Sequence, residues 1–306
     1  MLKGLRNGTF KMKHAPDIVL AGFAKCGTST LASQLVRMPE IDFHVKEKKE
    51  PHTYLFKWRE RSLRGLARPS DKLLLDASTG YSIFTNSLEK IAKANENAMV
   101  IFILRDPIDR IYSNINWLRK VEKKVLPFDL QIAEAHKKPR KANFSRRGNY
   151  LLSFHASFYA KTILLARKLF PNVMIIYFDD LKNNQTVVLD EIRKKLNLRE
   201  LDYKQEPIVA NATEQASYSK LQRRPLNFKT ALMKAIEFPL NVHRKIKFGV
   251  WLNLRYRISP REERGPGPSD WHSHKIIDII QADIELYSLA GIDLNRFKTL
   301  KDFLGD

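Results

Sequence analysis

The sequence has one cysteine and no long apolar run, and each shortage excludes a class of protein. Cys26 stands alone among 306 residues, so an internal disulfide and a multi-cysteine metal site are both excluded. No stretch of about 18 or more apolar residues occurs, so we expect no membrane-spanning helix. The basic segment 1–16 lacks the apolar centre of a secretory signal. These absences together favour a cytoplasmic protein.

Acidic residues are scarce relative to basic ones. The 33 Asp and Glu residues stand against 54 Lys and Arg, which gives a formal net charge of +21 at pH 7. A field of this sign attracts polyanions, which include nucleic acids, anionic lipids, nucleotides and acidic glycans. Charge alone does not separate an enzyme from a non-catalytic RNA-binding protein. The compact signatures of RNA-binding modules are absent, so we expect no specific nucleic-acid partner.

Short apolar runs alternate with helical patterns along the first two thirds of the chain. Apolar runs that suit buried strands lie at 17–22, 41–45, 73–76, 98–104 and 172–178. Helical spacing occurs at 30–38, 107–119, 151–170, 186–196 and 271–290. This alternation predicts a P-loop-like, three-layer α/β fold with a central, mainly parallel sheet flanked by helices.

We expect a single domain over residues 1–306. Its α/β core spans 17–200, a basic helical decoration covers 211–264, and a C-terminal helix in 271–306 packs on the core. Aromatic residues are interleaved with the lysines and arginines of 211–264. Two interpretations of this segment stay open. It forms a surface for an anionic acceptor or a peripheral membrane contact, or it is a helical cap whose charges face water.

The segment 22–31 (GFAKCGTSTL) lies between the first predicted strand and the first predicted helix. Backbone N–H groups and the helix dipole form an anion site at such a turn. Gly27 allows close approach of the backbone to a phosphate, and Lys25 adds a cation. Hydroxyl donors follow at Thr28, Ser29 and Thr30. The pattern predicts a phosphate-binding loop.

This loop is not a Walker A motif. In G-x-x-x-x-G-K-(S/T) the lysine directly follows the second glycine, whereas Lys25 precedes Gly27 here. A metal-dependent nucleotide kinase also needs an acid near a strand end to hold Mg²⁺. The strongest predicted strand ends instead at Arg105, whose guanidinium suits an additional phosphate. A P-loop nucleotide kinase or other phosphotransferase therefore remains only an alternative.

These segments resemble the sulfotransferases that use PAPS, 3′-phosphoadenosine 5′-phosphosulfate. Residues 25–29 (KCGTS) resemble the 5′-phosphosulfate loop of that family, and residues 103–113 (ILRDPIDRIYS) resemble its 3′-phosphate motif, L-R-(D/N)-P-x-x-R-x-x-S. Residues 49–52 (KEPH) and 75–81 (LDASTGY) resemble the K-E-x-H-F-F and E-K-(S/T)-P-x-Y segments of the carbohydrate branch, which includes the heparan sulfate enzymes.

The resemblance implies a role for each matching residue on the donor side. Lys25 contacts the 5′-phosphosulfate and stabilises charge on the bridging oxygen. Arg105 and Ser113 bind the 3′-phosphate. The loop that cradles the 5′-phosphate consists of Lys25, Cys26, Gly27, Thr28, Ser29 and Thr30. The implied co-substrate is PAPS and the released nucleotide is PAP, with no metal required because the donor is already activated.

On the acceptor side the resemblance implies that Glu50 or His52 is the catalytic base. The acceptor it implies is a hydroxyl, or an amine, of a carbohydrate or glycolipid. The chain departs from the family pattern at Ala77, where the family has a lysine. Lys48 and Lys49 are both candidates to supply the missing cation.

A second departure concerns the C-terminal nucleotide loop. Residues 264–271 (RGPGPSDW) resemble the R-K-G-x-x-G-D-W loop of the cytosolic branch, which would add Arg264 and Gly265 to the donor site. The alternative is a plain Gly/Pro linker, and the sequence leaves both open.

Overall fold

The structure is a computed structural model that describes residues 15–45, 48–55, 71–121, 128–137, 154–198 and 270–305. The basic segment 211–264, with Arg264, and the neighbouring Gly265 lie outside the described residues. Their predicted roles therefore stay predictions.

The centre of the molecule is a five-stranded sheet in which every paired strand is parallel. The strands are β1 (Ile18–Gly22), β2 (Ile41–Phe43), β3 (Leu73–Asp76), β4 (Met99–Leu104) and β5 (Val173–Tyr177), in the order β2-β3-β1-β4-β5. β1 and β4 are buried along their whole length. That burial explains their continuous apolar sequences, because helices cover both faces of a parallel sheet.

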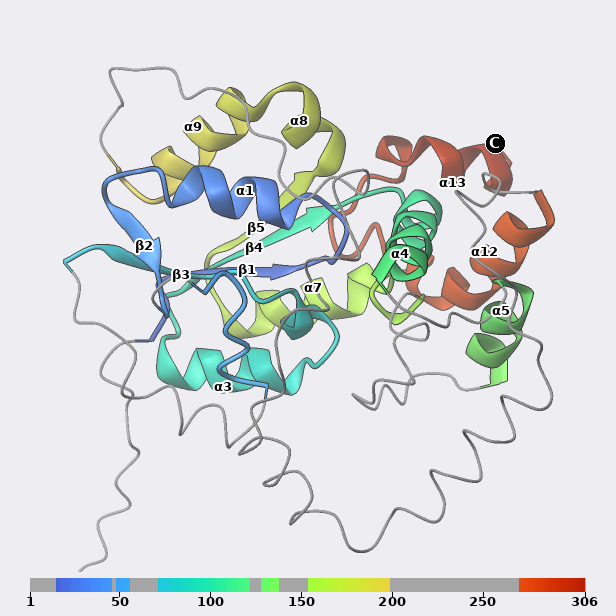
Figure 1. Cartoon of the computed structure of the whole chain (residues 1–306), viewed down its shortest axis with the longest axis horizontal. Coiled ribbons are helices and arrows are strands. Elements are labelled where there is room, and N and C mark those ends of the chain that lie inside the picture. The colour runs from blue at the N-terminus through green and yellow to red at the C-terminus, as the bar shows by residue number, and fades with distance from the viewer. Residues whose placement is uncertain are drawn as a thin grey trace, which may run out of the picture.

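Helices form a layer on each side of this sheet. Figure 1 shows α1 (Thr28–Leu35), α8 (Phe178–Asn183) and α9 (Gln185–Lys195) on one face, with α3 (Asn86–Ala94) and α7 (Tyr159–Leu169) on the other. The predicted three-layer α/β fold is confirmed. A short 3₁₀ turn, η1 (Thr79–Ser82), follows β3 and contacts β1.

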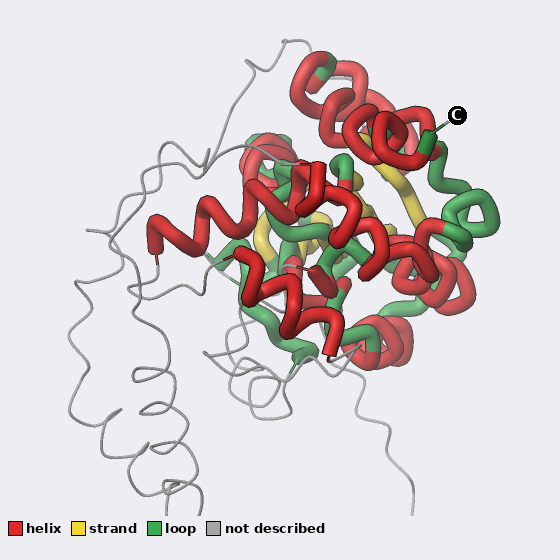
Figure 2. The backbone as a smooth tube through the Cα atoms, turned by 90° about the vertical axis from the view of Figure 1, so that its right-hand side faces the viewer, coloured by secondary structure: helices red, strands yellow, loops and turns green. Residues whose placement is uncertain are grey.

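The remaining helices lie beside one end of the sheet. They are α4 (Pro107–Val121), α5 (Phe128–Lys137), α12 (Asp270–Ile284) and α13 (Lys298–Leu304), with the 3₁₀ turn η4 (Leu294–Arg296) before α13. α12 contacts α4, α5 and α7, and α13 contacts α4. Figure 2, turned by 90°, shows helices around the strands of the sheet. The helix expected over 271–290 ends at Ile284.

One predicted helix begins later than its pattern suggests. Apolar periodicity starts at residue 151, but α7 begins at Tyr159. Residues 154 and 155 are also helical, but a turn at 156–157 separates them from α7. In the first turn of α7, the carboxylate of Asp283 on α12 accepts hydrogen bonds from the backbone N–H groups of Ala160 and Lys161 at 2.9 and 3.2 Å. It thereby satisfies donors that a helix leaves unpaired in its first turn. None of the helices in the described ranges is long and apolar enough to cross a membrane.

Candidate active site

The phosphate-loop candidate connects β1 to α1 through two residues in the left-handed region. Lys25 has φ 70° and Gly27 has φ 87°, directly before α1 begins at Thr28. A Cβ on Gly27 would lie 3.0 Å from the Leu181 side chain and 3.3 Å from the Phe178 ring. Glycine is therefore needed both for the backbone conformation and for the close packing of α8. The loop leads into the N-terminus of α1.

The phosphate-loop candidate, which contains Cys26, lies beside the end of β4, which Arg105 follows. β1 and β4 are neighbouring parallel strands, so the residues that follow them meet at one edge of the sheet. The Cys26 thiol is buried, and burial raises its pKa to about 11 against the opposing charges of Arg110 and Arg105. The buried Tyr159 hydroxyl donates to the Arg105 carbonyl at 2.8 Å. The thiol belongs to the buried core, and the predicted nucleotide-binding role of Cys26 stays a prediction.

Phe178, the first residue of α8, contacts both parts of this edge. The Arg105 guanidinium lies 4.8 Å from the centroid of the Phe178 ring, and the same ring packs beside Gly27. The Lys25 ammonium lies 5.6 Å from the Trp117 ring of α4. Ser113 lies one turn before Trp117 on α4 and is half-buried. The sequence-predicted donor-side residues are thus carried by the β1–α1 turn, the end of β4 and α4.

The start of α4 contains two buried ionisable groups. Asp106 accepts hydrogen bonds from the backbone N–H groups of Ile108 and of Leu300 in α13, at 3.0 and 2.8 Å. Burial raises the pKa of Asp106 to about 6, an effect that the Leu300 N–H opposes. Arg110 is fully buried, donates to Ser157 Oγ at 2.7 Å and to the loop carbonyl of Ala24 at 3.4 Å. Burial lowers the pKa of Arg110, and no carboxylate pairs with it within the described part of the chain.

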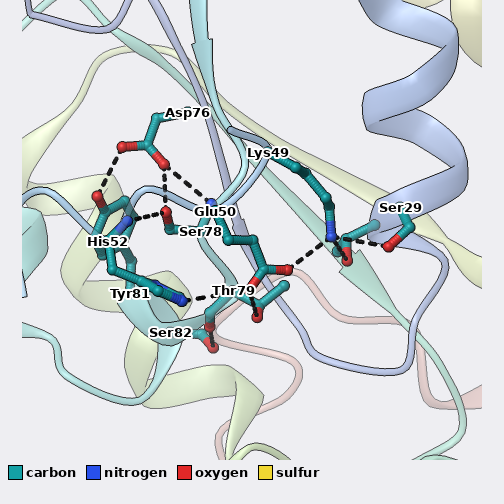
Figure 3. Close-up of polar contacts among 10 residues, drawn as sticks. Ser29, Lys49, Glu50, His52, Asp76, Ser78, Thr79, Tyr81 and Ser82 are labelled. Carbon is teal, nitrogen blue, oxygen red and sulfur yellow. Dashed lines mark hydrogen bonds and ion pairs between the residues drawn. The ribbon is translucent and has the colours of Figure 1, made fainter. Parts of the chain in front are cut away.

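The acceptor-side candidates form a connected group with the phosphate loop (Figure 3). Lys49 Nζ lies 2.7 Å from Glu50 Oε1 and donates to Ser29 Oγ at 2.9 Å and to Thr28 Oγ1 at 3.4 Å. The other carboxylate oxygen, Glu50 Oε2, lies 3.4 Å from His52 Nε2. The exposed fraction of the Glu50 side chain is 34%. The carboxylate is therefore held by its partners and is still accessible to solvent.

A buried carboxylate organises the loop on which this group rests. Asp76, at the end of β3, accepts hydrogen bonds from Ser78 Oγ at 2.5 Å and from the Tyr81 hydroxyl at 2.7 Å. Ser78 Oγ in turn accepts from the His52 backbone N–H at 2.9 Å, and Thr79 Oγ1 donates to Glu50 Oε2 at 3.4 Å. Desolvation by burial raises the pKa of Tyr81, and the Asp76 charge raises it further. Asp76 therefore fixes the positions of residues that contact Glu50 and His52 (Figure 3).

Sequence reasoning missed the parts played by Asp76, Arg110 and Tyr159. An acid at the end of the apolar run 73–76 is the one local signal for Asp76. Arg110 is the second arginine of the motif at 103–113, but its buried role depends on partners from other elements, and Tyr159 carries no local signal. The described residues contain no group of three or more His, Cys, Asp or Glu side chains arranged to hold a metal ion.

The fold is that of a P-loop-like α/β protein, in which the β1–α1 turn and the end of β4 lie at one edge of the sheet. Residues 15–253 match the family model described as the sulfotransferase domain. The chain belongs to this sulfotransferase family, whose members use PAPS as the sulfuryl donor, so the predicted enzyme class and donor are confirmed. Membership in the carbohydrate branch remains a prediction.

The chain is also similar to solved sulfotransferase structures, and the first of those named here supports the fold assignment. A sulfotransferase from Alicyclobacillus acidocaldarius is 17% identical, with 92% of this chain and 98% of that chain covered and a TM-score of 0.61. Mouse sulfotransferase SULT7A1, complexed with PAP, is 14% identical, with 94% and 88% covered and a TM-score of 0.41. A search of curated proteins finds no match to this sequence.

Proposed function

We propose that this enzyme transfers the sulfuryl group of PAPS to a hydroxyl, or an amine, of a carbohydrate or glycolipid acceptor and releases PAP. The observation that carries the proposal is the placement of Glu50. Its carboxylate is linked through Lys49 to the phosphate-loop hydroxyls of Thr28 and Ser29, and it is partly open to solvent. A carboxylate beside a phosphate loop is positioned to take a proton from an acceptor while the donor bond breaks.

Each residue has a stated task in this proposal. Arg105 and Ser113 bind the 3′-phosphate, and the β1–α1 loop binds the 5′-phosphate through backbone N–H groups. Lys25 stabilises negative charge on the bridging oxygen that leaves with PAP. Glu50 receives the proton of the acceptor hydroxyl as the new O–S bond forms and the old O–S bond breaks. His52 orients Glu50 from the other carboxylate oxygen.

Selective recognition of a nucleotide at both ends tests the donor side. PAP should raise the melting temperature of the protein more than ADP or AMP at equal concentration, because ligand binding to the native state alone stabilises it. Arg105→Ala should abolish the advantage of PAP over AMP. Arg37→Ala, which removes an exposed arginine just beyond α1, is the charge-matched control and should leave it intact. Equal stabilisation by PAP and AMP in the wild type would contradict the proposed donor site.

The acceptor is tested by transfer from ³⁵S-labelled PAPS. We expect label on desulfated oligosaccharides or glycolipids, and we expect Glu50→Gln to remove it while PAP binding persists. Labelling of phenols or simple alcohols alone would contradict the carbohydrate acceptor and leave the donor assignment standing.

A further inference from the structure

Lys49 lies between the phosphate loop and the carboxylate of Glu50. A lysine ammonium has three N–H donors, and Lys49 Nζ has three oxygen partners, Ser29 Oγ, Thr28 Oγ1 and Glu50 Oε1. Its backbone is also fixed, since the Lys49 carbonyl accepts from the Ala77 N–H at 3.1 Å. The ammonium is thus held where two binding regions of the site meet (Figure 3).

The position of the Lys49 ammonium offsets a charge repulsion that the proposed reaction would otherwise face. The 5′ end of the donor is anionic, and Glu50 must approach it as a carboxylate to accept a proton. Two like charges a few ångströms apart repel each other strongly in a partly desolvated site. A cation that contacts both the loop hydroxyls and the carboxylate cancels much of that repulsion.

We propose that Lys49 is the counter-ion that allows the Glu50 carboxylate and the anionic 5′ end of the nucleotide to occupy the site together. The inference rests on the proposed function. The short contact to Glu50 is kept, and the 3.4 Å contact to Thr28 is the one that a nucleotide oxygen replaces. Lys49 is therefore a ligand of the 5′ end as well as a positioning residue for Glu50.

Calorimetric titration with three nucleotides separates this role from a general loss of structure. PAP carries both phosphates, 5′-AMP only the 5′-phosphate and 3′-AMP only the 3′-phosphate. Lys49→Met should weaken binding of PAP and of 5′-AMP by about tenfold or more, the usual scale for a charge-assisted hydrogen bond, and should leave 3′-AMP unchanged. Lys93→Met is the matched control, because Lys93 is an exposed lysine in the last turn of α3, and it should change none of the three affinities.

The counter-ion role is tested by adding Glu50→Gln. Glu50→Gln alone should tighten PAP binding, since the repelling charge is removed. Added to Lys49→Met, it should restore part of the lost affinity, because no carboxylate then remains to be neutralised, while the direct contact of Lys49 with the 5′ end stays lost. Lys49→Arg, which keeps the charge, should retain affinity within about threefold of the wild type.

Several outcomes would overturn the proposal. Unchanged PAP affinity in Lys49→Met excludes contact with the 5′ end. An equal loss for 3′-AMP, accompanied by a lower melting temperature, shows that Lys49 is only structural. No recovery on adding Glu50→Gln excludes the counter-ion role. If Lys49→Met does not fold, the same titrations on Lys49→Gln decide, because glutamine removes the charge but keeps a polar side chain; unchanged affinity for PAP and 5′-AMP in that variant overturns the proposal.

If the proposed function itself is wrong, the wild type already shows no preference for PAP over AMP. A wild type that prefers PAP while Lys49→Met binds it normally refutes the role of Lys49 and leaves the donor site standing.

Discussion

Asp106 is a buried carboxyl at the start of α4, and folding makes its charged form costly. Its pKa rises from 3.8 to about 6 because burial removes water from the carboxylate, while the backbone N–H of Leu300 partly offsets this effect. A shift of this size corresponds to roughly 3 kcal/mol, at 1.36 kcal/mol per pH unit. The sign follows from proton binding. Between pH 4 and 6 the folded protein holds a proton on Asp106 that the unfolded chain has released.

The stability that Asp106 contributes is therefore full below about pH 3.8 and is lost as the pH rises through about 6. Asp106→Asn removes this titration. Urea denaturation of the wild type and of Asp106→Asn at pH 4, 5, 6 and 7 therefore isolates the contribution of the Asp106 carboxyl to stability. The free energy of unfolding of the wild type, minus that of Asp106→Asn, should fall by up to about 3 kcal/mol over this range. A constant offset of about 1 kcal/mol is expected as well, since an amide N–H₂ cannot accept from Leu300.

The exposed Asp302 of α13 supplies the control. Asp302→Asn should show no such change with pH. A difference between wild type and Asp106→Asn that stays flat, or that grows with rising pH, would refute the argument that burial dominates the proton affinity of this carboxyl.

Three further expectations concern the phosphate loop and the groups beneath it. Gly27→Ala should lower the free energy of unfolding by about 1–2 kcal/mol in urea denaturation, because φ is 87° and the new Cβ would lie 3.0 Å from Leu181; an unchanged midpoint would contradict this. Arg110→Met should weaken PAP binding about tenfold in calorimetry. It should not lower the melting temperature of the nucleotide-free protein, since the buried guanidinium has no acidic partner among the described residues. Normal PAP affinity in Arg110→Met would contradict this expectation. Cys26 should resist a thiol reagent at pH 8 in the native protein and react on denaturation, because the thiol is buried with a pKa of about 11; rapid native labelling would be inconsistent with that burial.

Local pattern was enough to predict the central layer of the fold. β1 and β4 are buried along their whole length, so every residue of each strand is selected for burial and the apolar run is continuous in the sequence. The turn between β1 and α1 was predictable for a related reason, because its lysine, glycine and hydroxyl residues lie within a few positions of one another; its phosphate-binding role stays a prediction. Both signals are contained in a few neighbouring residues.

Contacts between distant segments were not predictable in the same way. The first turn of α7 donates a hydrogen bond to Asp283, more than one hundred residues later, and Asp106 accepts one from Leu300 near the other end of the chain. Lys49 could be named as a candidate cation from its place beside Glu50. Its contact with Ser29 required the packing of the 49–52 segment against α1. Such pairings cannot be derived from the local pattern of a single sequence, because they form only when distant segments pack together.

Phe178 has a consequence for any attempt to alter nucleotide preference. Its ring lies under the Arg105 guanidinium and beside Gly27, so one apolar side chain is the spacer between the two proposed phosphate-binding regions. Shortening or enlarging that ring changes the gap between them without removing a single polar group. In the proposed donor site, the distance between the two phosphate-binding regions therefore depends on this ring, and redesign of donor preference should begin at the first residue of α8.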